Sequence, residues 1–344
     1  MSAQARRVLA PHDIDPAVPA AGSVVREFRG LTMGTTWMVR CALPADNDIS
    51  TLSELIQSQL DRVVSQMSTW ETGSDLSRYN SAAAGTWHTF PHECFDVLRH
   101  ALAVAEASNG AYDPTAGPLV NVWGFGPDRI PGERPDEAML SAARRRVGWQ
   151  RVEVEPATRR VYQPGGIYLD FSAIAKGYGV DAVMEALNAH GILHALVEVG
   201  GELRGQGMKP DGQPWWVGLE NPPAAEDERA QLSETVVALH GLSVATSGDY
   251  RRFFFTSGED GTRIRQSHTI DPRSGEPIHH GLAGVTVVHP VCMAADAIST
   301  ALNVLGAADG QRFAAEHGIA ARFVQCSGTT HQEIFSPAFE ALCR

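Results

Sequence analysis

The sequence predicts an α+β fold, with mixed and mainly antiparallel sheets flanked by helices. The strand-like runs are short, and several alternate apolar and polar residues as half-buried antiparallel strands do. Helical segments separate them without the regular strand–helix–strand order of a doubly wound sheet. The strand-like runs are residues 24–28, 36–43, 166–171, 194–200, 215–220, 234–240, 283–289 and 321–325.

Helical periodicity is clear in four segments. Within residues 50–68 the apolar side chains recur every three or four positions, which predicts one helix face packed on the core. Asn109-Gly110, Gly191 and Gly306 are glycine stop signals at the ends of the other three. Those three helices are expected over residues 92–110, about 173–190 and 296–306.

Length and charge limit the organisation of the chain. Its 344 residues contain no convincing linker, so we expect a single domain over 23–344, built as two intertwined lobes that share a core. Residues 1–22 are expected to form a flexible tail. The formal net charge of -12 argues against a nucleic-acid surface, which needs clustered lysine and arginine. No run of 18 apolar residues is present, so no membrane span is expected.

Cysteine usage and the N-terminal residues indicate the compartment. The five cysteines are scattered and form no paired motif, which fits a reducing environment better than a disulfide framework. Arg6 and Arg7 are not followed by the apolar run that a signal peptide needs. We therefore expect a cytoplasmic protein, or a periplasmic one if the true start lies upstream.

The first candidate site surrounds Lys176, one of only two lysines in the chain. A strand ending at Asp170 and followed by small residues would let the backbone approach a ligand closely. Lys176 would then lie in the first turns of a helix, where its ammonium group could meet a phosphate. A partly buried ion pair between Asp170 and Lys176 explains the same residues, and the residues alone do not separate the two interpretations.

Two further candidates carry polar side chains. Asp296 and Thr300 are four apart on a predicted helix, so both oxygens project from one face and suit Mg²⁺. The simpler interpretation is that Asp296 caps that helix and Thr300 packs. His268 stands three residues before Asp271 at a turn and is a candidate general base, although a histidine in a turn is more often a surface residue.

Several motifs, taken together and in order, resemble the ApbE family of FAD:protein FMN transferases. The resemblance covers about residues 31–310, with GAYDPTAGPLVNVWGFG as its most specific match. The motifs are MGTTW (33–37), MSTWETGSDLSRYN (67–80), GAYDPTAGPLVNVWGFG (110–126), YLDFSAIAKGYGVD (168–181), VEVGGELRGQG (197–207), VATSGDYRRFF (244–254), SHTIDPRSG (267–275) and AADAISTAL (294–302). The resemblance implies an ApbE-like fold, similar to the T-fold, with two lobes around one FAD cleft.

The resemblance also implies roles for individual residues. Asp296 and Thr300 match the side-chain metal ligands of the family, and the Ala173 carbonyl matches a backbone ligand for Mg²⁺, with Mn²⁺ as an alternative. His268 matches the histidine near the flavin phosphates and is our candidate catalytic base, with Asp271 orienting it or shaping the turn. The positions that match FAD-binding residues are Met33, Trp70, Ala111, Tyr112, Asp113, Asp170, Lys176 and His268. Trp70 stands where the family usually has tyrosine.

The implied reaction is transfer of FMN from FAD to a threonine hydroxyl of an acceptor flavoprotein, with release of AMP. Hydrolysis of FAD to FMN and AMP is the alternative activity, because the same contacts would serve an attacking water. A non-enzymatic FAD-binding or delivery protein is the third interpretation. The expected partners are FAD and the acceptor flavoprotein, and a homodimer is one candidate assembly.

Overall fold

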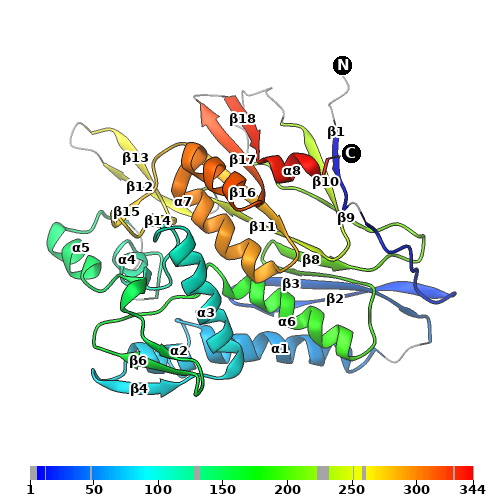
Figure 1. The fold of residues 1–344 in the computed structure, drawn as a ribbon, viewed down its shortest axis with the longest axis horizontal. Coiled ribbons are helices and arrows are strands. Elements are labelled where there is room, and N and C mark those ends of the chain that lie inside the picture. The colour runs from blue at the N-terminus through cyan, green and yellow to red at the C-terminus, as the bar shows by residue number, and fades with distance from the viewer. Residues whose placement is uncertain are drawn as a thin grey trace.

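An eight-stranded sheet forms the centre of the computed structural model, which describes residues 6–11, 13–46, 49–127, 132–222, 232–250, 252–257, 261–327 and 330–343 (Figure 1). Its order is β18-β17-β16-β11-β8-β7-β3-β2, and every neighbouring pair is antiparallel. The strands are β2 (Ser23–Thr32), β3 (Thr35–Pro44), β7 (Ala195–Val199), β8 (Glu202–Gln206), β11 (Leu242–Gly248), β16 (Leu282–His289), β17 (Ala320–Ser327) and β18 (Thr330–Phe335). The predicted α+β class with mainly antiparallel sheets is confirmed.

Helices cover one face of this sheet. Helices α6 and α7 lie side by side on it, and α1 lies beside α6 (Figure 1). Apolar residues of α1 and α6 meet β2, β3 and β7 in one core cluster, and α7 packs on β11, β16 and β17 in another. The helices are α1 (Leu52–Met67), α2 (Asp75–Asn80), α3 (His92–Ala107), α4 (Gly117–Val122), α5 (Glu137–Arg144), α6 (Ala175–Ala189), α7 (Cys292–Glu316) and α8 (Pro337–Ala341), with a 3-10 turn at Trp149–Arg151.

A three-stranded sheet, β1-β10-β9, contributes to a core cluster on the other face of the large sheet, together with α8. Its strands are β1 (Arg6–Leu9), β9 (Trp215–Gly218) and β10 (Glu234–Leu239). The expected flexible tail over residues 1–22 is therefore wrong for Arg6–Leu9. This segment pairs in parallel with β10, and Leu9 is fully buried. The pairing partner lies more than 200 residues away in the sequence, and local pattern could not reveal it.

The remaining strands form small sheets at one end of the molecule. They are β4 (Thr86–Thr89), β5 (Val154–Glu155), β6 (Arg160–Gln163), β12 (Phe253–Ser257), β13 (Arg263–Ser267), β14 (Ile270–Asp271) and β15 (Glu276–Pro277). The predicted strand over 166–171 is wrong, because this segment belongs to no sheet. Its backbone is held instead by Asn80, whose side chain bonds Leu169, and by the Pro114 carbonyl, which accepts from Asp170.

Helix α7 differs most from its prediction. It begins at Cys292, four residues before the predicted start, and continues beyond Gly306 to Glu316. Gly306 has a φ of 78° and interrupts the helix as a kink, where His280 packs against it. The predicted stop at Gly306 is therefore confirmed as the end of the first helical segment. A second helical segment follows it to Glu316, packs against β17 and continues the cover of the sheet. Within the described ranges, no helix is both long and apolar enough to span a bilayer.

Candidate active site

The first turn of α6 and the second turn of α7 meet at Gly177. Its N–H donates to Asp296 Oδ2 at 3.0 Å, and Asp296 is only 3% exposed. A Cβ on Gly177 would come within 2.5 Å of the Cys292 carbonyl oxygen, so only glycine allows this approach. Asp296 therefore belongs to the second turn of α7, and the Gly177 N–H of α6 orients its carboxylate. It is not the cap of its own helix, because Val291 occupies the N-cap position.

Lys176 projects beside this contact. Its Nζ lies 2.6 Å from Glu202 Oε1 on β8 and 3.9 Å from Asp296 Oδ1. Asp170, the partner considered from the sequence, instead accepts hydrogen bonds from the backbone and hydroxyl of Ser172, at 2.8 and 2.5 Å. The described ion pairs thus hold the ammonium group between a strand carboxylate and the predicted metal ligand.

Thr300 lies one turn after Asp296 and belongs to a small hydroxyl cluster. Ser247 Oγ on β11 is 3.0 Å from Thr300 Oγ1 and 2.8 Å from Ser299 Oγ. Ala173 is half-buried in the turn before α6, and no described group donates a hydrogen bond to its carbonyl oxygen. A carboxylate, a hydroxyl and a vacant carbonyl are hard oxygen donors, so these three residues fit a divalent cation such as Mg²⁺.

The acidic side chains alone would not hold a metal. Among the described residues, no group of three or more His, Cys, Asp or Glu side chains comes together as a metal site. A cation at Asp296 would therefore depend on neutral oxygen ligands and on oxygens of a bound phosphate, which is the usual situation for Mg²⁺.

The Tyr112 hydroxyl is buried near three carboxylates. Burial raises the pKa of Tyr112 well above its ordinary value, and the charges of Asp296, Asp170 and Asp113 raise it further. Tyr112 is 3% exposed, and its hydroxyl has no hydrogen-bond partner among the described residues. Such an unpaired buried donor is costly in the free protein, so the Tyr112 hydroxyl is a candidate to bond a ligand.

Asp113 has a structural environment. Its Oδ1 accepts from the backbone and the hydroxyl of Thr115, both at 2.7 Å, and its Oδ2 accepts from the Trp149 backbone at 3.2 Å. Burial raises the pKa of Asp113, and the Thr115 and Trp149 hydrogen bonds oppose that effect. Ala111, which precedes Tyr112 in the sequence, is 1% exposed and packs in a small core cluster that anchors this segment.

Met33 and Trp70 lie on loops. Met33 and Gly34 have φ values of 48° and 71° and form the two-residue turn between β2 and β3. The Met33 side chain packs between two core clusters, close to Gly179 of α6. Trp70 follows α1 and is 58% exposed, so its indole face is open to a planar ligand.

His268 directly follows β13. Its Nδ1 lies 3.0 Å from the Arg252 carbonyl, and its ring contacts Phe125 edge-on. A carbonyl can only accept, so this bond puts the proton on Nδ1 and makes Nε2 the basic nitrogen of the neutral ring. The next residue, Thr269, receives a 3.5 Å contact from Asn303, which lies one turn after Thr300 on α7.

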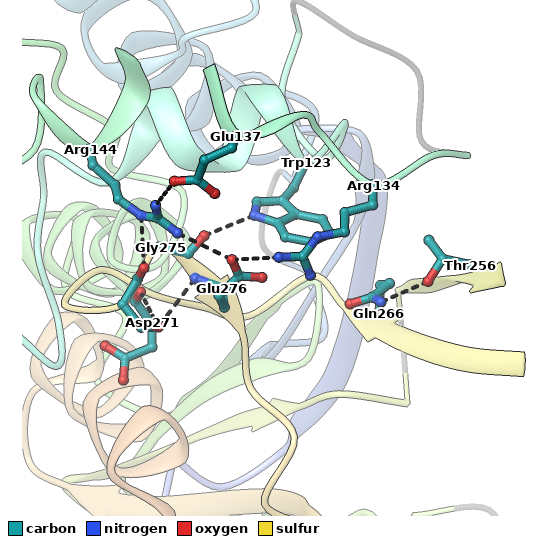
Figure 2. Close-up of polar contacts among 10 residues, drawn as sticks. Trp123, Arg134, Glu137, Arg144, Thr256, Gln266, Asp271, Gly275 and Glu276 are labelled. Atoms are coloured by element: carbon teal, nitrogen blue, oxygen red, sulfur yellow. Dashed lines mark hydrogen bonds and ion pairs between the residues drawn. The ribbon is translucent and has the colours of Figure 1, made fainter. Parts of the chain in front are cut away.

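The turn after His268 is anchored by α4 and α5 (Figure 2). The Trp123 indole donates to the Gly275 carbonyl at 2.9 Å, and Arg144 donates to the Ser274 carbonyl and to Glu276. Asp271 itself bonds the backbone and the guanidinium of Arg273. Of the two roles considered for Asp271, these contacts correspond to shaping the turn.

A cavity of about 580 Å³ lies between α3, the end of β16, α8 and α7, and Ile298 and Phe313 of α7 both contribute to its lining. It is lined mainly by apolar side chains, and none of the predicted site residues contributes to it.

Comparison with known proteins confirms the family resemblance seen in the sequence. A family model described as the ApbE family matches residues 33–323, which is most of the chain. The chain belongs to the ApbE family. Curated members with the name FAD:protein FMN transferase include one from Klebsiella pneumoniae (strain 342), 35% identical over 94% of this chain and 90% of that protein. Another, from Vibrio cholerae, is 36% identical over 90% of each chain.

Solved structures of the family have the same fold. The apo form of the flavinyl transferase ApbE from Pseudomonas stutzeri matches with a TM-score of 0.83 and 37% identity, over 94% of this chain and 98% of that chain. The flavin transferase ApbE from Vibrio cholerae also matches with a TM-score of 0.83, at 33% identity over 93% of this chain and 99% of that chain.

Three residues that contact the predicted site residues or their helices are not indicated by the sequence reasoning. Glu202, Ser247 and Asp181 lie inside quoted motifs, yet their partners lie on other elements. The one usable signal was alternation. Glu202 and Arg204 are two apart on β8, so both side chains project from the same face of that strand.

Proposed function

We propose that this ApbE-family chain transfers the FMN moiety of FAD to a threonine hydroxyl of an acceptor flavoprotein. The threonine oxygen forms a bond to the FMN phosphorus, the bond from that phosphorus to the bridging pyrophosphate oxygen breaks, and AMP leaves. The observation that carries the proposal is the contact between α6 and α7, where Lys176 Nζ lies 3.9 Å from Asp296 Oδ1, one turn before Thr300 on α7. The names of the curated relatives support the same reaction.

The residues of the chain divide the work. Asp296, Thr300 and the Ala173 carbonyl would hold Mg²⁺, which neutralises phosphate charge and polarises the phosphorus when bound. Lys176 binds a phosphate oxygen as a point charge, held in place by Glu202. Trp70 covers one face of a flavin ring, and the Tyr112 hydroxyl supplies a hydrogen bond from the buried side.

His268 is the proposed base. The Arg252 carbonyl fixes the proton on Nδ1, so Nε2 accepts the threonine proton as the new phosphoester forms. The anchored turn after His268 supports the orientation of the ring. General-base catalysis of this kind contributes about 10²–10⁴-fold to rate.

The test follows both products in one reaction. An acceptor flavoprotein is incubated with the chain, FAD and Mg²⁺, with and without EDTA, while intact-protein mass spectrometry follows the acceptor and chromatography follows AMP. We expect a gain of one FMN unit per acceptor, matched by AMP, and loss of both with EDTA or in Asp296→Ala. Asp309→Asn, an exposed position on the same helix α7, is the matched control and should retain full activity.

His268→Ala should lower the rate about 10²-fold or more while FAD still binds. Unchanged turnover in that variant would remove His268 from the mechanism. AMP release without acceptor modification would favour FAD hydrolysis. FAD binding without AMP release would indicate a binding protein.

A further inference from the structure

Helix α7 begins without a cap of its own. Its N-cap residue is Val291, with φ and ψ of -112° and 121° and no capping side-chain hydrogen bond. The first amide groups of any helix lack partners within the helix, and a valine side chain cannot accept from them. Because α7 carries Asp296 and Thr300 in its first turns, the way its start is held affects the candidate site.

Asp181 supplies the missing acceptor from another helix. Its Oδ1 accepts from the Cys292 N–H at 3.1 Å, and its Oδ2 accepts from the Met293 N–H at 2.9 Å. Asp181 lies on α6, 111 residues earlier in the chain, and is 5% exposed. A buried carboxylate at a helix N-terminus is favoured by both the amide bonds and the helix dipole.

Arg204 on β8 completes this contact. Its Nη1 lies 2.6 Å from Asp181 Oδ1, and the guanidinium compensates the buried negative charge. Gly177 lies one turn before Asp181 on α6, and its N–H bonds Asp296. Helix α6 therefore holds α7 at two places, at its first two amides and at the candidate metal ligand itself.

We propose that Asp181 is a positioning residue for the cation site. By capping α7 in place of a local N-cap residue, it fixes the rotation and translation of the turns that carry Asp296 and Thr300 relative to Lys176. This inference rests on the proposed cation-binding role of Asp296 and Thr300. Loss of a residue that orients metal ligands typically costs about 10–100-fold in metal affinity.

The experiment measures Mn²⁺ binding to the full-length chain by electron paramagnetic resonance, together with hydrogen exchange of the segment 290–296. Asp181→Ala should raise the Mn²⁺ dissociation constant at least about tenfold and speed exchange of the first α7 amides. Val291→Thr, nearly isosteric, places an acceptor hydroxyl at the N-cap. Added to Asp181→Ala, it should restore slow exchange and recover part of the affinity.

Val183→Ala is the matched control. Val183 lies on the same helix and is fully buried, but it faces the core shared with β3 and β7. It should lower the melting temperature without changing the Mn²⁺ dissociation constant, which separates positioning from general loss of stability. Asp181→Ala with wild-type Mn²⁺ affinity, equal weakening in Val183→Ala, or no recovery with Val291→Thr would each overturn the inference.

Failure of the proposed function gives a different pattern. If the wild-type chain binds no Mn²⁺, or if Asp296→Ala binds Mn²⁺ as tightly as the wild type, the cation site is contradicted. The positioning role of Asp181 is then contradicted with it. Mn²⁺ binding that depends on Asp296 but not on Asp181 would contradict the positioning role alone.

Discussion

Lys176 Nζ and Glu202 Oε1 lie 2.6 Å apart, and this ion pair joins the start of α6 to strand β8. Glu202 is 2% exposed, whereas the Lys176 side chain is 28% exposed, so the pair holds a partly accessible ammonium on a buried carboxylate. Two residues further along β8, Arg204 pairs with Asp181 of the same helix. Strand β8 thus holds the charged side chains of both Lys176 and Asp181 on α6.

Glu202→Gln should weaken both the fold and FAD binding. The change removes the nearer of the two carboxylates that pair with Lys176, and a hydrogen bond between charged groups contributes about 2 kcal/mol to stability. We expect a loss of that size in the free energy of unfolding by urea titration, and weaker FAD binding by fluorescence titration. Glu27→Gln, which removes an exposed carboxylate paired with Arg29 and Arg40, should leave FAD binding unchanged.

Gly177→Ala should separate α6 from α7. Helix propensity alone would make alanine more stable by about 1 kcal/mol, but the new methyl group would meet the Cys292 carbonyl at 2.5 Å and Asp296 Cβ at 2.9 Å. Overpacking typically costs about 1–3 kcal/mol, so we expect a net loss of stability and of transferase activity. Gly218→Ala, with no atom within 4 Å of its new Cβ, is the control. A stabilised Gly177→Ala protein would contradict this packing.

Tyr112→Phe tests the buried hydroxyl. Removing a donor that has no described partner relieves a desolvation cost, so stability should stay the same or rise slightly. FAD affinity should fall about tenfold if the hydroxyl bonds the ligand, since an unmet ligand group loses a hydrogen bond of about 1.5 kcal/mol. Thermal unfolding and equilibrium dialysis with FAD measure the two effects. A marked fall in melting temperature would reveal a partner for the hydroxyl in the free protein.

Trp70→Ala tests the exposed indole. Because Trp70 is 58% exposed, its removal should leave the melting temperature unchanged. Loss of a stacking surface should weaken FAD binding, and Trp70→Tyr should restore much of it. Trp87→Ala removes another exposed aromatic side chain, 40% exposed and placed on β4, and should not alter FAD affinity. Equal effects of Trp70→Ala and Trp87→Ala would argue against stacking at Trp70.

The buried thiol of Cys41 predicts an alkaline loss of stability. Burial raises the pKa of Cys41 from 9.0 to about 12. The folded state therefore keeps the thiol protonated while the unfolded state ionises, so this stabilisation is complete below pH 9 and is lost as the pH rises toward 12. Urea unfolding between pH 8 and 10.5 should show a decline that is shallower in Cys41→Ala. Iodoacetamide should label exposed Cys326 in the native protein and leave Cys41 unlabelled.

Local sequence pattern predicted the helices whose apolar face is continuous. Helices α1, α3 and α6 lie within two or three residues of their expected limits. Periodicity predicted all three, and the ends of α3 and α6 were also indicated by glycine stop signals. The predicted helix over 296–306 begins four residues after the start of α7, whereas its predicted end at Gly306 coincides with the kink inside α7. The start of α7 has no local cap signal, and its continuation past Gly306 depends on packing against β17.

The residues of the candidate site also fall into two groups, those that sequence motifs predict and those that only the structure reveals. Family motifs identified Asp296, Thr300, Lys176 and His268, because each stands in a characteristic string of neighbours. The cytoplasmic location, the homodimer and the individual residue roles stay predictions.

The fold class and the family could be inferred from the sequence without any structure, and the sequence also predicts the candidate site residues. These properties are written in short stretches of the chain, where periodicity and motif spacing are local. Tertiary structure alone decided that Glu202 holds Lys176, that Asp181 caps α7 and that Arg6–Leu9 joins a sheet. Each of these contacts joins segments that lie far apart in the chain or on different elements, and only the packing of the folded protein brings those atoms within bonding distance.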